Sequence, residues 1–183
     1  VPEPDMDKKK AYSWVKAPRY NSLPFEVGPL ARLILSGHYI NRISAMDRTI
    51  ARALEAKKIA DIMKILLKQI IPDVEMQQQY ELPISASGRG LVDTTRGALG
   101  HWLEIQNQKI SFYQIITPST WDFSTRDENG YRGVAEEALI GPPIANVDEP
   151  VEIGRILRSF DPCMSCATHV YSPGKEVKTI QVF

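Results

Sequence analysis

The sequence predicts a mostly α-helical chain with a small antiparallel β patch, an α+β arrangement built around one long central helix. Helical spacing of apolar residues runs across residues 44–71 and returns across residues 149–160. Between these stretches, two short apolar segments flank a polar turn, which is typical of a β-hairpin. At 183 residues the chain is long enough for one ordinary core, so we treat residues 1–183 as a single domain.

The N-terminal part of the chain has few regular signals. Residues 1–11 are polar and contain Pro2 and Pro4, so they predict a flexible entry segment. The following stretch mixes aromatic residues with prolines and predicts an ordered but irregular segment. Pro29 suits the first turn of a helix, and a short helix is therefore expected from Pro29 to Gly37.

The long helix is expected from Ser44 to Ile71. Its apolar residues follow i, i+3 and i+4 spacing, and alanines add intrinsic helix propensity. Pro72 and Asp73 end it. We expect a buried structural helix, whose apolar face consists of Ile59, Ile62, Met63, Leu66, Leu67 and Ile70.

The second half of the chain alternates between loops and short elements. Ser85–Gly90 reads as a flexible, turn-rich stretch. Trp102–Ile105 and Ile110–Ile116 are expected to be strands joined by Asn107, Gln108 and Lys109. Asp122–Gly133 is expected to be a polar loop, and Glu149–Phe160 a helix.

Composition and charge exclude several classes of protein. Lys plus Arg and Asp plus Glu are both 22, so there is no electrostatic reason to expect nucleic acid as a partner. The longest apolar runs are far shorter than a membrane span. The start shows no signal peptide and no initiating Met, which suggests a fragment or a processed piece. The chain has 2 cysteines, too few for a disulfide scaffold.

The strongest chemical signal is the segment Asp161–His169, which reads D-P-C-M-S-C-A-T-H. Its two cysteines, Cys163 and Cys166, can turn thiolates toward one ion, and thiolates suit nickel, zinc, copper(I) or iron–sulfur clusters. His169 offers an imidazole, and Asp161 can orient a sulfur or relay a proton. On spacing alone a zinc site, a redox dithiol and a chance pair all remain open.

Two thiolates do not complete a tetrahedral metal site. The other histidines, His38 and His101, are more often structural than ligands in such positions. The chain therefore holds half a metal site, and residues 1–183 are best regarded as a single partial domain.

The pattern D-P-C-x-x-C-x-x-H near the carboxyl end resembles the C-terminal cysteine motif of nickel–iron hydrogenase large subunits. Other segments resemble the same family in the same order, so the resemblance covers residues 12–169 as the C-terminal region of such a protein. It implies the C-terminal part of that fold, with its long central helix. The further segments are Ser13–Tyr20, Glu26–Arg32, Arg96–Trp102, Pro118–Trp121 and Glu137–Gly141.

The resemblance implies a nickel–iron hydrogenase, which cleaves H2 reversibly and heterolytically to protons and electrons. Cys163 would be a terminal ligand of nickel, and Cys166 would bridge nickel and iron, giving two of the four cysteine ligands. The iron in this family carries cyanide and carbon monoxide. Arg96 would stand over this centre with Asp161 as its partner, because a fixed guanidinium can polarise H2 or assist a base.

The resemblance also assigns residues around the centre. Pro118 and Ser119 would line the cyanide pocket, where a hydroxyl can donate to a cyanide nitrogen. A magnesium ion would bind the imidazole of His169 and the carbonyl of Ile115. One departure is Thr95, since many relatives have proline before the arginine.

A larger departure concerns the other half of the ligand set. The family's first motif, R-x-C-G-x-C, and the proton-accepting glutamate beside it have no counterpart in this sequence. We expect another polypeptide or a longer gene product to supply them, together with a small subunit that carries iron–sulfur clusters. A membrane-associated or periplasm-facing complex is favoured over a cytoplasmic one, and the compartment remains open.

The resemblance further implies that a maturation endopeptidase cuts between His169 and Val170, so residues 170–183 would be a cleavable tail; a short terminal strand is the alternative. Two other functions remain open beside catalysis. One is a non-catalytic H2-sensing or assembly module of the same fold, and the other is a small zinc-binding protein.

Overall fold

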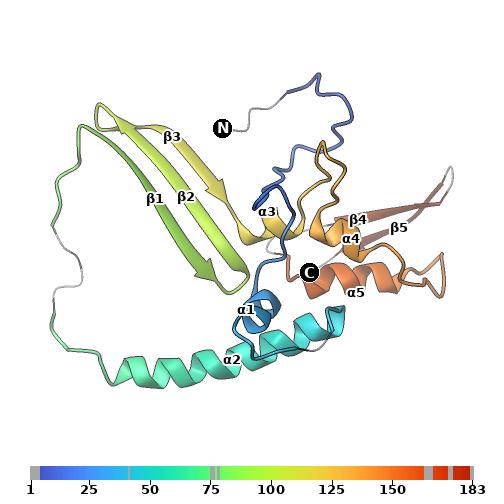
Figure 1. The fold of residues 1–183 in the computed structure, drawn as a ribbon, viewed down its shortest axis with the longest axis horizontal. Coiled ribbons are helices and arrows are strands. Elements are labelled where there is room, and N and C mark those ends of the chain that lie inside the picture. The colour runs from blue at the N-terminus through green and yellow to red at the C-terminus, as the bar shows by residue number, and fades with distance from the viewer. Residues whose placement is uncertain are drawn as a thin grey trace.

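The computed structural model describes residues 5–40, 42–74, 77, 79–162, 167–172 and 175–181. Most of the helices are grouped in a central body, and the three-stranded antiparallel sheet and one long helix extend from it (Figure 1). The helices are α1 (Pro29–Leu35), α2 (Ala45–Leu67), α3 (Pro118–Asp122), α4 (Val134–Ala138) and α5 (Val151–Ser159). The strands are β1 (Ser85–Thr94), β2 (Gly97–Gln106), β3 (Lys109–Ile116), β4 (Ala167–Ser172) and β5 (Lys175–Gln181).

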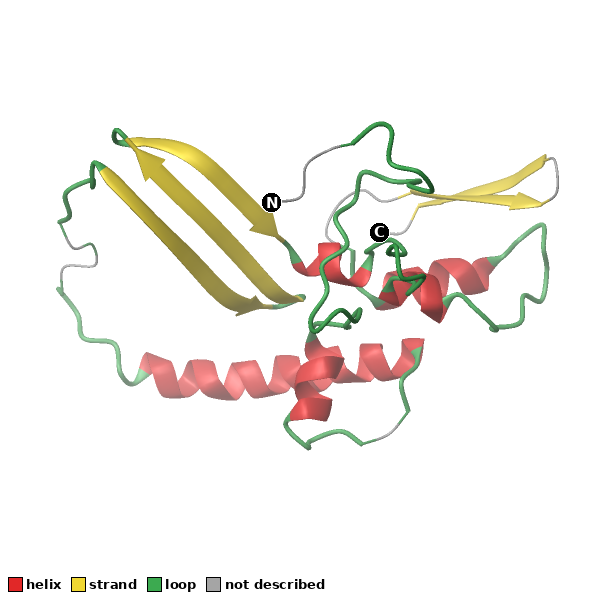
Figure 2. Cartoon of the chain, turned by 45° about the horizontal axis from the view of Figure 1, so that its top comes forward, coloured by secondary structure: helices red, strands yellow, loops and turns green. Residues whose placement is uncertain are grey.

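The chain is mixed α/β rather than mostly helical. Its 3-stranded antiparallel sheet, in the order β1-β2-β3, is as prominent as the helices (Figure 2). The prediction of a turn-rich Ser85–Gly90 was wrong, because these residues begin β1 and pair with β2 from Ser85↔Gln106 to Thr94↔Gly97. Backbone pairing needs no apolar side chains, and β1 is an exposed edge strand, so its composition gave no alternating pattern.

The predicted hairpin is confirmed, with longer strands than expected. Asn107 and Gln108 form its turn with φ of 52° and 58°, the paired positive values of a two-residue hairpin loop. β3 pairs with β2 from Gly100↔Ile116 to Gln106↔Lys109. The turn sets the β2–β3 register next to it, and the register shifts between Glu104 and Ile105.

The two N-terminal helices are confirmed, with α2 shorter than predicted. The predicted burial of the apolar face from Ile59 to Ile70 was wrong, because these side chains are exposed in the described part of the chain. Pro29 opens α1, and the side chain of Ser44 caps α2 by accepting the Asp47 N–H at 3.2 Å. The start of α2 packs on α1, and its end at Leu67 falls before Pro72. One core cluster lies at this crossing and contains Leu30, Leu33, Tyr39 and Ala51.

A second core lies between α4 and α5. It contains Ala135, Leu157 and Phe160, and the Phe123 ring meets the Phe160 ring edge-on. The helix expected over residues 149–160 is confirmed as α5. Most of the segment after Asp122 is the predicted polar loop, and Arg19 pins it, with Nε 2.7 Å from Asp127 Oδ2.

The C-terminal segment forms a two-stranded antiparallel hairpin, β4-β5, in which His169 pairs with Thr179. Cys163 and Cys166 lie outside the described residues, as does the side chain of His169. In the described part of the chain, no helix has the length and apolar character needed to cross a membrane.

Candidate functional site

Arg96 and Asp161 come together from distant parts of the chain. Arg96 lies in the turn between β1 and β2, and Asp161 follows α5. The Nε of Arg96 donates to the Asp161 carbonyl oxygen at 2.8 Å and lies 3.1 Å from its carboxylate Oδ2. The predicted pairing is present, and it orients the guanidinium directly before the cysteine motif.

Two glycines explain why the Arg96 turn can reach this position. Gly97 has φ of +125°, and a Cβ there would lie 2.6 Å from the backbone nitrogen of Gly28. A Cβ on Gly28, at φ +112°, would lie 2.8 Å from the carbonyl oxygen of Arg96. The two loops therefore touch backbone to backbone, which only glycine permits.

The neighbour of Arg96, Thr95, is held by a network around Arg32. Arg32 Nη2 donates to the Thr95 carbonyl at 3.3 Å and to Glu55 Oε2 at 2.6 Å, while its Nη1 contacts Asp93 Oδ1 at 2.7 Å. These bonds join α1, α2 and the end of β1. The turn is thus fixed by hydrogen bonds.

Asp161 adopts φ of 54°, a left-handed conformation at the end of α5. Its N–H donates to the Arg158 carbonyl at 3.0 Å, which closes the helix. Asp tolerates this conformation better than most residues. The reversal turns the chain toward Arg96 and leads through buried Pro162 to Cys163.

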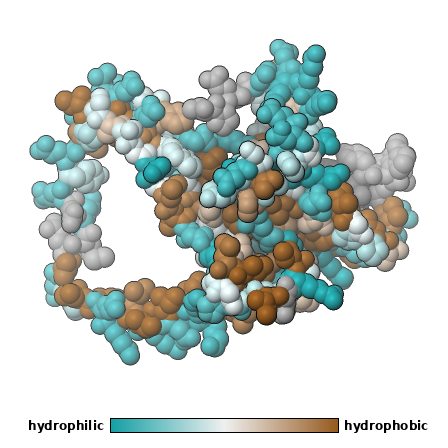
Figure 3. Space-filling view, viewed as in Figure 1, coloured by the Kyte–Doolittle hydropathy of each residue, from teal (hydrophilic) through white to brown (hydrophobic). Residues whose placement is uncertain are grey.

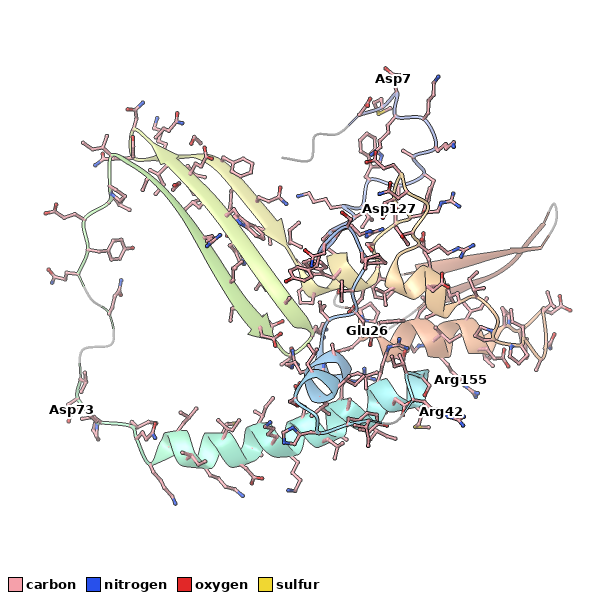
Figure 4. All side chains as sticks on the ribbon, in the orientation of Figure 1. Asp7, Glu26, Arg42, Asp73, Asp127 and Arg155 are labelled. Atoms are coloured by element: carbon pink, nitrogen blue, oxygen red, sulfur yellow. The ribbon has the colours of Figure 1, made fainter. Side chains whose placement is uncertain are left out.

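Behind this pair lies a second, more buried ion pair between Glu26 and Arg48. Two parallel hydrogen bonds of 2.8 Å join Arg48 Nε and Nη2 to Glu26 Oε1 and Oε2. The Phe160 ring centroid is 3.8 Å from the guanidinium carbon. Figure 4 shows Glu26 near the middle of the molecule, where this bidentate pair joins the loop before α1 to α2.

Asp122, the last residue of α3, is a buried carboxyl. Its Oδ1 accepts the Val27 N–H at 3.0 Å. Burial raises the pKa of Asp122 to about 8, with a further increase from Glu26, against the opposing effects of the Val27 N–H and Arg48. Burial therefore favours the protonated form of this carboxyl group.

A cavity of about 20 Å³ joins these groups, and its lining includes Glu26, Arg48, Arg96, Asp122, Ser159 and Asp161. That volume suffices for one water molecule among polar partners. On the other side of Glu26 and Arg48 an open groove of about 760 Å³ borders the same ion pair. The Glu26–Arg48 ion pair therefore lines both the small cavity and the open groove.

Pro118 and Ser119 belong to α3. Pro118 is its buried first residue, and Thr117 caps it by accepting the Thr120 N–H at 3.3 Å. Ser119 lies one turn before Asp122, so α3 connects both predicted pocket residues to the cavity through Asp122. Their contact with a cyanide ligand stays a prediction.

The predicted magnesium site is only partly covered by the structure. Ile115 lies near the end of β3, and its carbonyl accepts a bond from Gln114 Nε2 at 3.1 Å. His169 is described by its backbone alone. Within the described residues, no three His, Cys, Asp or Glu side chains are grouped to hold a metal ion.

The other histidines have structural partners. His38 Nδ1 lies 2.9 Å from Ser36 Oγ, and His101 Nδ1 lies 2.7 Å from the Tyr113 hydroxyl. Both contacts are local to their own helix end or hairpin. This agrees with the expectation that the two residues are structural.

Sequence reasoning did not identify Asp122, Glu26 and Arg48 as site residues. Glu26 and Asp122 do border two of the family-like segments, since Asp122 directly follows Trp121. A charged residue at the edge of such a segment was the available signal. Their burial depends on contacts between segments about a hundred residues apart, which local patterns do not report.

Comparison with known proteins shows the family to which the chain is similar. The family described as nickel-dependent hydrogenase matches residues 3–42 and 38–169. The periplasmic [NiFeSe] hydrogenase large subunit of Desulfomicrobium baculatum is 38% identical over 91% of this chain. The hydrogenase-1 large chain of Citrobacter freundii is 34% identical over 97% of this chain. The chain covers 37% and 35% of these two relatives.

Solved structures show the same similarity in three dimensions. The reduced, active Ni-Fe-Se hydrogenase from Desulfomicrobium baculatum superposes with a TM-score of 0.80 at 40% identity, over 87% of this chain and 38% of that one. The as-isolated oxidised enzyme from D. vulgaris Hildenborough gives 0.80 at 35% identity, with the same coverage. The fold is thus similar to part of each of these larger chains.

Proposed function

This chain belongs to the nickel-dependent hydrogenase large-subunit family, and from that premise we propose that it is the C-terminal portion of a hydrogenase that cleaves H2 reversibly to protons and electrons. The observation that supports this best is the Arg96–Asp161 pair, because it fixes a guanidinium beside the segment that enters the cysteine motif. A permanently charged, oriented donor suits a site where charge develops as H2 is split.

Cys163 and Cys166 would hold the Ni–Fe centre as two of its four thiolate ligands. The donor chemistry fits, since soft thiolates stabilise nickel and iron. Both positions are cysteine in this sequence, so we propose that a sulfur atom is the ligand at each of them. When bound, the centre, with cyanide and carbon monoxide on its iron, supplies the place where H2 is cleaved heterolytically.

The residues of this chain would position and transfer charge around that centre. Asp161 would orient the guanidinium of Arg96, and the carboxyl group of Asp122, which lines the same cavity, would hold a proton. Ser119 would donate its hydroxyl to a cyanide nitrogen, with Pro118 as an apolar wall. His169 and the Ile115 carbonyl would bind magnesium.

The proposed enzyme needs further polypeptide. The chain spans 34–37% of the curated relatives it matches, and it carries one of the two cysteine pairs. The remaining ligands and the proton-accepting glutamate would come from the rest of the large subunit. A small subunit with iron–sulfur clusters would carry the electrons, and an endopeptidase would remove residues 170–183.

The function is tested with Cys163→Ser and Cys166→Ser, made together in the assembled complex. We expect nickel content and H2 uptake to fall to background, because each serine removes a thiolate ligand. Lys58→Ser, on the exposed polar face of α2, is the matched control and should leave both unchanged. Nickel is measured by elemental mass spectrometry, and uptake with an artificial electron acceptor.

Each other result has a defined meaning. Normal nickel content and turnover in the double variant would contradict the metal site. Nickel in the unaltered complex without any turnover would favour the H2-sensing or assembly module. Zinc in place of nickel would favour the zinc-binding alternative.

A further inference from the structure

Asp122 ends α3 inside the central body and holds another segment of the chain. The residue is 3% exposed. Figure 3 shows the central body as closely packed atoms beside the opening between α2 and the three-stranded sheet. Asp122 Oδ1 accepts the Val27 N–H at 3.0 Å. Because bulk water does not compete for this buried hydrogen bond, it ties α3 firmly to the loop before α1.

Val27 lies directly against the turn that carries Arg96. A Cβ added to Gly97 would meet Val27 Cγ2 at 2.6 Å and the Gly28 backbone nitrogen at 2.6 Å. In the other direction, a Cβ added to Gly28 would meet the Arg96 carbonyl oxygen at 2.8 Å. The loop that Asp122 holds is therefore the surface against which the Arg96 turn packs.

The second oxygen of the Asp122 carboxyl group, Oδ2, accepts no hydrogen bond from the described residues. Asp122 lines the cavity of about 20 Å³ together with Thr95 and Arg96. This volume can hold one water molecule, and buried polar atoms that lack a protein partner usually bind one. Since burial favours the protonated carboxyl group, its O–H can donate to that water.

Asp122 acts through hydrogen bonds rather than through an ion pair. The cation whose charge influences it, Arg48, is bound to Glu26 by two hydrogen bonds. Arg96, which lines the same cavity, pairs with Asp161. A neutral amide in place of the carboxyl group would therefore offer the same acceptor to the loop and a donor to the water.

We propose that Asp122 is a positioning residue for Arg96: one of its oxygens holds the loop at Val27, the other binds a water molecule in the cavity, and both contacts keep the Arg96 turn in place. The consequence for H2 cleavage rests on the function proposed above, because the guanidinium must face the Ni–Fe centre to polarise H2. α3 also carries Pro118 and Ser119, so one helix would join the cyanide pocket to the arginine turn.

Asp122→Leu in the assembled complex removes both contacts with a side chain of the same branched shape. We expect amide hydrogen exchange in residues 93–98 to become at least about tenfold faster, because the turn opens more readily without this support. H2 uptake should fall by about tenfold at unchanged nickel content, since a small misplacement of a catalytic group is costly. The infrared bands of the cyanide and carbon monoxide ligands should shift, because they report the charge around the iron.

Two variants serve as controls. In Asp122→Asn the amide oxygen can accept the Val27 N–H and the NH2 group can donate to the water, so exchange, infrared bands and uptake should stay close to wild type. Ser124→Ala is the matched control for a general loss of stability, since Ser124 is 2% exposed and lies outside the cavity lining. It should leave uptake and the exchange of residues 93–98 unchanged.

Three results would overturn the proposal. The first is wild-type exchange of residues 93–98 in Asp122→Leu. The second is an equal change in Ser124→Ala, which would indicate a general loss of stability. The third is loss of uptake in Asp122→Asn, which would assign the carboxyl group to proton transfer. Asp122→Ala repeats the comparison if Asp122→Leu does not assemble.

Hydrogen exchange keeps this test separate from catalysis. The same peptides are measured in the complex with Cys163→Ser and Cys166→Ser, in which the proposed metal ligands are absent. Faster exchange caused by Asp122→Leu in that complex would support the positioning role even if the proposed function failed. Wild-type uptake by an active enzyme that carries Asp122→Leu would overturn the positioning role alone.

Discussion

At Arg96, orientation matters more than the strength of the ion pair. Its side chain is 38% exposed and that of Asp161 is 45% exposed, so water screens their attraction. The hydrogen bond from Arg96 Nε to the Asp161 carbonyl nevertheless ties the guanidinium group to the backbone. The orientation of its two terminal nitrogens is therefore restricted. A guanidinium held in this way can face a reacting centre without reorganising.

Arg96→Lys keeps the charge but removes the planar fork and the Nε donor. We expect nickel content to stay unchanged while H2 uptake falls by about 100-fold, the usual cost of losing one oriented donor. Uptake assays and elemental analysis of the assembled enzyme measure both. Arg89→Lys, on exposed β1, is the control, and unaltered turnover in Arg96→Lys would contradict a role for the fork.

Asp122 makes stability depend on pH. Its pKa is about 8 in the folded chain, against an ordinary value of 3.8, so the unfolded chain ionises first as pH rises. Stability from this group is full below about pH 4 and is lost progressively toward pH 8, by up to about 1.4 kcal/mol per pH unit.

Asp122→Asn should remove this dependence, because the amide oxygen can still accept the Val27 N–H and cannot ionise. We expect a higher unfolding temperature than wild type at pH 8 and little difference at pH 4. Thermal unfolding of the assembled enzyme across that range measures it. Asp148→Asn, an exposed site, is the control; an equal pH slope in wild type and Asp122→Asn would show that this carboxyl is not responsible.

At the scale of elements, local signals predicted those parts of the fold that local chemistry decides. Pro29 opens α1, the Ser44 side chain caps α2, and Asn107 with Gln108 makes the hairpin turn. β1 was not predicted, because Ser85–Gly90 is rich in serine and glycine and its strand geometry comes from pairing with β2.

The candidate site was likewise predicted only in part. Arg96 and Asp161 were predicted through family-like motifs, and their contact is present. Asp122 and the Glu26–Arg48 pair were not predicted, because burial arises where α3, α5 and the loop before α1 meet. Only the folded arrangement gives a carboxyl the environment that changes its pKa.

The crossing of the Gly28 and Gly97 backbones tests how the elements hold the site. Gly97→Ala would force a Cβ to within 2.6 Å of the Gly28 nitrogen at a φ of +125°. We expect a loss of about 1–3 kcal/mol of stability and displacement of the Arg96 turn, with reduced H2 uptake. Thermal unfolding and uptake are compared with Gly90→Ala, where an added Cβ meets nothing within 4 Å. Similar behaviour of the two variants would contradict the close crossing.

At the scale of the whole molecule, the described chain has two small cores rather than one large one. One lies at the crossing of α1 and α2, and the other between α4 and α5. The sheet and the second half of α2 extend from this body (Figure 1). Strand β1 and the second half of α2 are exposed. A chain with so little buried apolar surface is expected to gain much of its stability from additional polypeptide.

The tail gives a prediction about maturation. If the proposed endopeptidase acts, the large polypeptide in nickel-loaded enzyme should end at His169. Intact-mass measurement of active enzyme tests this, with Cys163→Ser protein as the unprocessed reference. Retention of residues 170–183 in fully active enzyme would contradict the cut and leave the terminal-strand alternative.

Because of the β4-β5 hairpin, such a cut would be irreversible. The bond after His169 lies inside β4, and His169 pairs with Thr179 on β5. Cleavage there would release β5 together with half of β4, so the three β4 residues that stay behind would lose the strand that supplies their backbone hydrogen bonds. They would have to find new partners elsewhere, and the released peptide would diffuse away. Maturation would then be an irreversible conformational step, completed once for each molecule.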